Sequence, residues 1–271
     1  MAVADGLTPA VAAADEYNLQ TPQTIFAHEV YDLHTLIFVI CCVIFVVVFG
    51  AMFYSIFKHR KSPGHKPVNF HESIAVELAW AIVPFVIVIL LVLPAVWAVV
   101  AMKDTSNADI TIKATGMQWK WGYDYVKGEG EGISFFSNLY APRRLAVDPT
   151  TAKSDNYLLE VDNPVVVPVN KKIRMILTAK EVIHVWHVPA LGVKQDAIPG
   201  FDGDTWFKAQ EIGTYRGLCS VASCGTGRAC LLVVVNVVSD GDYKKWVDSK
   251  RKAMAANADD ASKIRTVGLE R

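Results

Sequence analysis

The strongest constraint on this chain is an uninterrupted apolar stretch. From Thr35 to Phe57 it reads TLIFVICCVIFVVVFGAMFYSIF, 23 residues without a charged side chain. As a helix rising about 1.5 Å per residue, the stretch is long enough to cross a hydrocarbon layer of roughly 30 Å. A core helix of a water-soluble protein rarely runs so far without a charge. The sequence therefore predicts a transmembrane helix here.

A second apolar stretch, from Ser73 to Met102, completes a helical hairpin. The connecting loop, KHRKSPGHKP, contains four lysines and arginines. Basic residues in short loops favour the cytoplasmic side, so both chain ends and the region after the hairpin are expected in the periplasm or its equivalent. Glu77 can share one helical stripe with Ser73 and Trp80. A carboxylate at that depth favours contact with a partner membrane subunit over contact with lipid.

The charge and composition of the chain exclude one class of function. Lysine plus arginine and aspartate plus glutamate both number 27, and no basic stripe occurs. Nucleic-acid binding needs a cationic surplus to neutralise phosphates and is therefore excluded. Residues 1–24 are small, polar and acidic, without the basic start and apolar core of a secretion signal. Either such a signal has been removed or the true start of the chain lies upstream.

Beyond Asp104 the pattern changes to short β-rich runs separated by Gly, Pro and Asn. They include DITIKATG, QWKWGYDY, NYLLEVD, PVVVPVN, KIRMILTAK, EVIHVWHVP and LLVVVNVVS. This spacing is typical of a β-sandwich or a Greek-key barrel. We therefore expect a polar segment over 1–24, a hairpin over 25–102, an all-β domain over 103–240 and a polar helix with a tail over 241–271.

An aromatic string opens the β-rich region. In GMQWKWGYDY, Trp119, Trp121, Tyr123 and Tyr125 occupy alternate positions, so one strand would project all four from the same face. Two interpretations stand. The face packs on the core or on a membrane surface, or it is a docking surface on which an indole ring passes electrons between redox centres.

Soft metal ligands occur in two places. His184 and His187 are three residues apart in EVIHVWHVP, so on a strand they face opposite sides and only one can point at a given interior site. Cys219, Cys224 and Cys230 cluster in a later loop. One imidazole and two thiolates suit copper, zinc or iron. Outside the cytoplasm, a disulfide between Cys219 and Cys224 is the competing interpretation.

The segment VKQDAIPG, from Val193 to Gly200, follows the histidine strand. One interpretation is a solvated loop. In the other, acidic residues exposed here, such as Asp196, attract a basic protein partner and raise its association rate.

Taken together, these strings resemble subunit II of haem–copper cytochrome c oxidases. The resemblance covers about residues 25–240: both spans, ELAWAIVP, the aromatic string, VIH–VP, VKQDAIPG, and GTYRG before the cysteine loop. It implies a two-helix transmembrane hairpin plus an all-β cupredoxin-like Greek-key barrel. It also implies an electron-input subunit in the inner membrane of a bacterium, with a periplasmic two-copper centre that takes electrons from cytochrome c and passes them to haem in subunit I for oxygen reduction.

The same resemblance assigns roles to individual residues. Trp119 matches the tryptophan that receives electrons, and Asp124 and Asp196 match the acidic docking face. The expected copper ligands are His184, Cys219 and Cys224. Glu77 and Trp80 are expected contacts with subunit I, and the resemblance further implies a magnesium ion at the interface with that subunit.

The cysteine loop departs from the family pattern C-x-E-x-C-x-x-x-H-x-x-M. This sequence reads CSVASCGTGRACL, with Arg228 in place of the second histidine and Leu231 in place of the methionine. A guanidinium does not lose its proton to bind copper, and leucine has no donor atom. The cysteines are one residue further apart than in the family, and the glutamate that the family uses near magnesium is absent.

Three explanations remain open for residues 218–231. Two compensating single-base slips in the gene reading would alter this stretch and spare its flanks. A genuine copper-free or altered site would let Cys219, Cys224, Cys230 and His184 hold a single metal. A periplasmic disulfide would mean that electron transfer has been lost. Two other functions also stay open: subunit II of a copper-free quinol oxidase, and a membrane-tethered copper-binding or assembly protein.

Overall fold

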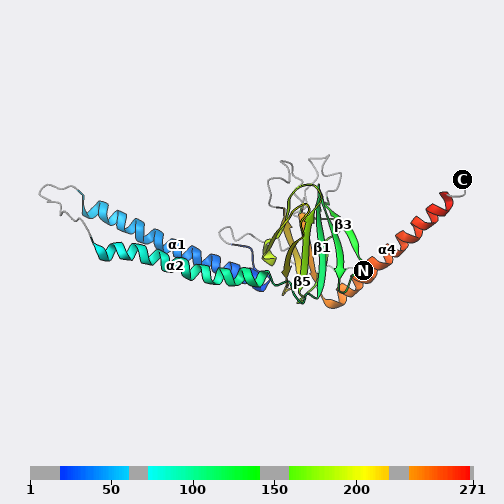
Figure 1. Ribbon diagram of the computed structural model, residues 1–271, viewed down its shortest axis with the longest axis horizontal. Helices are drawn as coiled ribbons and strands as arrows, with labels where there is room; N and C mark the ends of the chain where they lie inside the picture. Colours follow the sequence, from blue (N-terminus) through cyan, green and yellow to red (C-terminus); the bar gives the residue numbers. More distant parts are fainter. Residues whose placement is uncertain (1–18, 61–72, 141–158, 220–231, 269–271) are drawn as a thin grey trace, which may run out of the picture. The chain divides into compact units, whose positions relative to one another are not determined.

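The computed structural model describes residues 19–60, 73–140, 159–219 and 232–268, with side chains described up to residue 256. Figure 1 shows the elements in the order of the chain. The chain forms two compact units. One spans Glu29–Ala101, and the other combines the residues before it with those after it.

The first unit contains nearly all of the helices α1 (Ile25–Lys58) and α2 (Ile74–Met102). Both helices are long and apolar enough to cross a membrane, and the most apolar 18-residue window of each contains no buried residue. Side chains that are apolar and uncovered along a whole helix suit a lipid environment. The predicted two-helix hairpin is confirmed.

Helix α1 begins ten residues before the stretch expected from hydropathy, at Ile25 instead of Thr35. The reason is local. Thr24 caps the helix, because its Oγ1 accepts the backbone N–H of Ala27 at 3.0 Å. The first turns of α1 mix apolar residues with charged ones such as Glu29 and Asp32, so an apolar pattern alone does not reveal them.

The second unit is a β-barrel built from a five-stranded sheet in the order β3-β2-β1-β5-β8, a three-stranded sheet in the order β4-β10-β9, and the pair β6-β7. Two pairs, β1 with β5 and β4 with β10, are parallel, and the other pairs are antiparallel. The strands are β1 (Ile110–Met117), β2 (Lys120–Lys127), β3 (Ser134–Asn138), β4 (Val165–Pro168), β5 (Ile173–Ala179), β6 (His184–Val188), β7 (Val193–Ala197), β8 (Gly203–Phe207), β9 (Gly213–Leu218) and β10 (Leu232–Val238).

One hydrophobic core fills the barrel, because alternate side chains of both larger sheets point inward. Strand β5 shows this clearly: its buried and partly buried residues alternate along all seven positions. Met175 and Leu177 from this strand are fully buried, as are Val233 and Val235 from β10. The all-β prediction for this part of the chain is confirmed.

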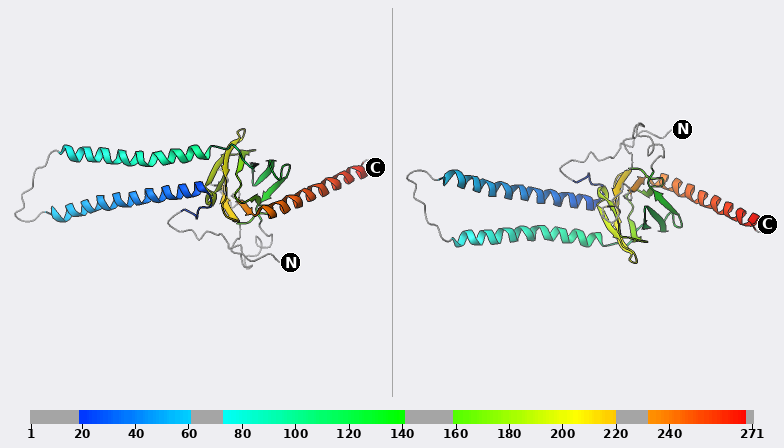
Figure 2. Two further views of the ribbon diagram at one scale, coloured as in Figure 1. Left: turned by 90° about the horizontal axis from the view of Figure 1, so that it is seen from below. Right: turned by 90° about the horizontal axis from the view of Figure 1, so that it is seen from above.

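Helix α4 (Asp240–Gly268) follows the last strand. Its start is capped by Ser239, whose Oγ accepts the N–H of Asp242 at 3.2 Å. Tyr243 and Val247 are buried against the barrel, and the Trp246 ring lies 5.4 Å from that of Tyr125. In both views of Figure 2, α4 starts at the barrel and its later turns point away from it.

Two strand expectations were wrong. The segment NYLLEVD forms no strand within its described residues, where Val161 makes only an isolated bridge to Leu139. In contrast, VKQDAIPG is not a loop, since Val193–Ala197 is strand β7 and pairs with β6. The exposed Lys194 and Asp196 alternate with buried or partly buried neighbours, which is the pattern of a strand with one face exposed to solvent.

Candidate functional site

Three segments that are distant in the sequence meet at one end of the barrel. Strand β6 begins at His184, and the backbone N–H of the next residue, Val185, donates to Sγ of Cys219 at 3.3 Å. The N–H of Lys180 donates to the carbonyl of Gly116 near the end of β1, at 3.0 Å. The imidazole strand, a cysteine and the β1–β2 turn are therefore neighbours, although they lie up to about a hundred residues apart in the chain.

His184 is held in a tight and almost dry position. Only 1% of the residue is exposed, and its ring lies 6.0 Å from the ring of Trp121 in an edge-on arrangement. The ring packs against the bare backbone of Gly116, where an added Cβ would come within 2.7 Å of Cδ2 of His184. Burial lowers the pKa of His184, with Glu181 acting in the opposite direction. The imidazole is therefore neutral at neutral pH, which is the form that binds metals.

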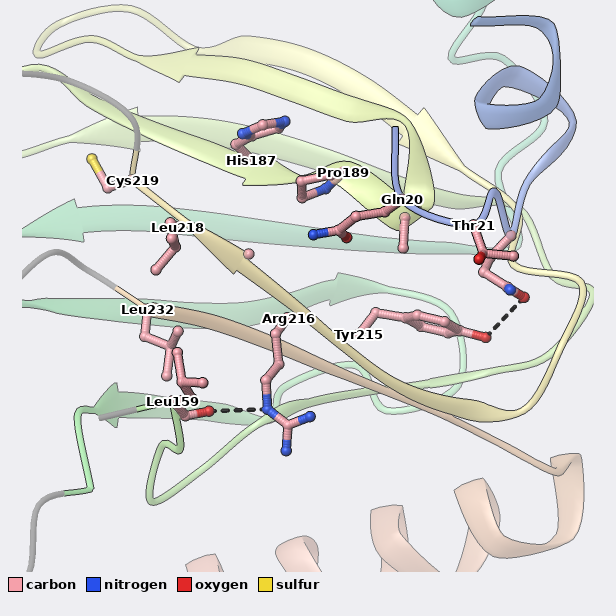
Figure 3. A pocket seen from close by; sticks show the side chains of 13 residues that line it. Gln20, Thr21, Leu159, His187, Pro189, Tyr215, Arg216, Leu218, Cys219 and Leu232 are labelled. Atoms are coloured by element: carbon pink, nitrogen blue, oxygen red, sulfur yellow. Dashed lines mark hydrogen bonds between the residues drawn. The ribbon is translucent and has the colours of Figure 1, made fainter. Parts of the chain in front are cut away.

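His187 has different surroundings, as expected from the odd spacing of the two histidines. It is partly buried, and burial together with the nearby Lys194 lowers its pKa. Figure 3 shows its ring at a pocket, whereas His184 lies among buried residues. The prediction that only one of the two histidines points into the interior is confirmed.

The pocket beside His187 has a volume of about 590 Å³ and mostly apolar walls. Some of its polar groups already form hydrogen bonds with other residues. Tyr215 donates through its hydroxyl to Oε1 of Gln23 at 3.3 Å, and Nε of Arg216 donates to the carbonyl of Leu159 at 3.0 Å (Figure 3). Cys219 also lines this pocket but is itself only 4% exposed.

Cys219 is disulfide-bonded. A sulfur in a disulfide is not a thiolate, so it has to be reduced before it can bind a soft metal ion. The structure therefore holds Cys219 in a disulfide, whereas the expected pairing with Cys224 lies outside the described residues and stays a prediction. Cys224, Cys230, Arg228 and Leu231 lie outside the described residues.

The aromatic string divides into two parts, so the expectation of four aromatics on one face was wrong. Trp121, Tyr123 and Tyr125 are at most 2% exposed and belong to the core. Trp119 is 60% exposed, because β1 ends at Met117 and its pairing with Lys120 leaves Trp119 in the turn between the strands. Alternation along a strand no longer applies at a hairpin tip.

The acidic residues occupy different positions. Asp196 is exposed on β7 and lies opposite Val185 in the register. Asp124 on β2 is partly buried and accepts a hydrogen bond from the hydroxyl of Ser134. Glu77 belongs to the helical unit, in the first turn of α2, where its N–H donates to the carbonyl of Ser73 at 3.0 Å.

Sequence reasoning missed Glu181. Its Oε2 accepts the backbone N–H of Gln118, next to Trp119, at 3.4 Å, and its charge acts on His184. The side chain is exposed. A charged residue three positions before the site histidine is a signal that could have identified it.

Two of the predicted soft-metal ligands are neighbours among the described residues. His184 is a neutral, buried imidazole, and the sulfur of Cys219 lies next to its strand. Within residues 19–60, 73–140, 159–219 and 232–256, no group of three histidine, cysteine or acidic side chains is placed to hold an ion. The sequence also has Arg228 and Leu231 where two further ligands are expected. The residues present therefore do not fit a complete two-copper centre.

Comparison with known proteins places the chain in a family. Residues 12–97 match the model of the transmembrane domain of cytochrome c oxidase subunit II, and residues 110–238 match that of its periplasmic domain. The chain belongs to the cytochrome c oxidase subunit II family. It is thus the electron-input subunit of an oxidase complex embedded in a membrane, in a family that binds copper. The cupredoxin-like barrel expected from the resemblance is confirmed.

Individual relatives are similar in sequence to this chain along most of their own length. The subunit 2 of Cyanidium caldarium is 34% identical over 87% of this chain and 91% of its own length. That of Cereibacter sphaeroides is 33% identical over 83% and 77%, respectively. Among solved structures, the periplasmic domain of oxidase subunit II from Bradyrhizobium japonicum is 41% identical over 55% of this chain and 98% of its own, with a TM-score of 0.47.

Proposed function

We propose that this subunit receives electrons from a cytochrome c at the β1–β2 turn, with Trp119 as the receiving side chain. The observation that carries the proposal is the placement of this indole. It is 60% exposed, although the other three aromatics of the same string are buried. Tryptophan is enriched among the side chains that contribute most to binding at protein interfaces, so an exposed indole beside carboxylates suits a surface that meets a partner.

The surroundings of Trp119 support a basic partner. Glu181 is bonded to the backbone beside the indole, and Asp196 lies exposed on the strand that pairs with the His184 strand. Carboxylates around an apolar contact steer a basic cytochrome c and set its orientation. We include Asp124 at the margin of this docking face, since it is partly buried and already bonded to Ser134.

The metal part of the proposal is narrower than the family pattern. We assign His184, Cys219 and Cys224 as ligands of a soft metal ion in the reduced chain. A pair of coppers would need donors that Arg228 and Leu231 do not provide. Magnesium at the interface with subunit I also lacks its expected glutamate. No electron-transfer step is therefore assigned to the metal.

The location and the membrane partners follow from the hairpin. The basic loop between the spans supports a location of the barrel outside the cytoplasm, in the periplasm of a bacterium. Glu77 and Trp80 on α2 are proposed contacts with subunit I and its companion subunits. Both side chains are uncovered along the helix.

The docking proposal is tested by binding of cytochrome c to the full chain in detergent, measured across a range of salt concentrations. Trp119→Leu is expected to weaken binding severalfold at every salt concentration, because an apolar contact is lost. Glu181→Gln and Asp196→Asn are each expected to weaken it roughly two- to fivefold, and only at low salt, because exposed charges are screened.

The matched control is Phe136→Leu, which removes another exposed aromatic side chain, 50% exposed, from β3. It is expected to leave binding unchanged. Equal losses for Phe136→Leu and Trp119→Leu, or binding that does not depend on salt, would contradict the docking face proposed here.

A further inference from the structure

Trp206 is an outward-facing residue of β8 that is nevertheless partly buried. Its neighbours Thr205 and Phe207 are 6% and 0% exposed and point into the barrel, so the indole between them projects from the outer face. Two other segments pack on it. The ring of Phe26 meets it edge-on with centroids 4.8 Å apart, and Nζ of Lys172 lies 4.2 Å from the centroid of the indole ring.

Lys172 fixes the segment by which the chain leaves α2. Its Nζ donates to the carbonyls of Asp104 and Ser106 at 2.8 and 2.7 Å. Its backbone N–H donates to Oδ2 of Asp109 at 2.8 Å. The ammonium group of Lys172 thus has two carbonyl acceptors and a favourable contact with the face of an indole. These interactions hold the segment Lys103–Asp109 against the barrel.

Phe26 fixes the segment by which the chain enters α1. The ring is 8% exposed. The residues before it are also bonded to the barrel. Thr24 donates through its hydroxyl to the carbonyl of Leu191 at 2.9 Å, and the backbone N–H of Gln23 donates to the carbonyl of Ala190 at 2.9 Å. The segment Gln23–Ala27 therefore lies on the corner between β6 and β7.

We propose that Trp206 is a positioning residue that clamps both of these segments, so that the two connections between the barrel and the membrane hairpin are coupled. We call Phe26, Lys172 and Trp206 the connection clamp. The chain enters and leaves the barrel unit through these two segments, and order in both reduces the conformational freedom of the chain there. An electron-input domain depends on such limits, because its contact with the rest of the oxidase has to be maintained.

Each segment also has a support that does not involve the indole. Thr105 donates to Oδ2 of Asp204 at 3.0 Å, and Arg174 Nε donates to Oδ1 of the same carboxylate at 2.9 Å. Thr24 provides the corresponding support on the other side. Loss of the indole is expected to loosen both segments. Because these other bonds remain, the barrel itself is expected to stay folded.

Hydrogen exchange of the full chain in detergent, read by mass spectrometry, tests this coupling. Trp206→Ala is expected to accelerate exchange by roughly tenfold or more in both Gln23–Ala27 and Lys103–Asp109, with the strands of the barrel unchanged. Lys172→Met is expected to do so mainly in Lys103–Asp109. Trp206→Phe keeps an aromatic ring for both contacts and is expected to restore most of the protection.

The matched control is another lysine that lies on an aromatic ring of the barrel surface. Nζ of Lys120 is 4.1 Å from the ring centroid of Phe136, and Phe136→Ala is expected to leave both segments protected. The coupling is refuted if Trp206→Ala loosens at most one segment. It is equally refuted if exchange rises uniformly through the barrel strands, or if Trp206→Phe behaves like the alanine variant.

Discussion

Gly217→Ala is the most demanding perturbation of the site, because this glycine allows β9 to approach β6 at backbone distance. An added Cβ would lie 1.9 Å from the carbonyl oxygen of His187 and 2.9 Å from Cγ2 of Val188. Strand β9 leads directly to Cys219, and β6 starts at His184. The substitution therefore forces apart the two strands that place the imidazole and the sulfur.

The size of the effect follows from the contact. Ordinary carbon–oxygen contacts begin near 3.4 Å, so the strands would have to separate by about 1.5 Å, and the obstacle is backbone that cannot change rotamer. Overpacking of a core costs about 1–3 kcal/mol where side chains adjust, and more where they do not. We expect a loss of about 3 kcal/mol or more, a large part of the stability of a typical domain.

The assay is urea unfolding of the full chain in detergent, followed by the fluorescence of its buried tryptophans. Gly213→Ala on the same strand is the matched control, because its Cβ would meet only the flexible end of Tyr215, at 3.2 Å. The control is expected to cost less than about 1 kcal/mol. Equal stability of the two variants would refute the reasoning that β6 and β9 touch through bare backbone.

Three further predictions concern single groups of the barrel. Burial holds the pKa of His184 below its ordinary 6.5, so as pH falls the unfolded chain binds a proton before the folded chain does. The free energy of unfolding should therefore fall as pH drops below about 6.5, and His184→Gln should flatten that fall in urea titrations. Tyr125 donates to the carbonyl of Val166 at 2.7 Å and accepts its N–H at 3.2 Å, so Tyr125→Phe should cost about 1–2 kcal/mol in the same assay, and an unchanged midpoint would contradict it. Soft metal ions should bind only after reduction of the disulfide at Cys219, and Cys219→Ser should abolish that binding in a metal titration by mass spectrometry; uptake by the oxidised chain would argue against it.

Local patterns predicted much of the architecture. The spans were predictable because hydropathy is a property of consecutive residues. Strands β5 and β10 were predictable because apolar residues alternate along the first and follow one another along the second. Strand β7 was missed although its alternation is present, since Lys194, Asp196 and the following Ile-Pro-Gly favour a turn. The early start of α1 was missed because its first turns contain charged residues such as Glu29 and Asp32, so hydropathy does not mark them.

The site was only partly predictable for the same reason. The opposite placement of His184 and His187 follows from strand geometry alone. The exposure of Trp119 does not, because it depends on the residue at which β1 ends and the chain turns. Glu181 acquires its place from a contact with Gln118, 63 positions away, which no local pattern contains.

Copurification tests the central claim most directly. A tagged full chain, extracted gently from the membrane, is expected to bring with it a haem-containing protein of many membrane spans, detected by its absorption spectrum and by mass spectrometry. Isolation of the chain alone, folded and without haem under conditions that keep other respiratory complexes intact, would contradict its assignment as an oxidase subunit.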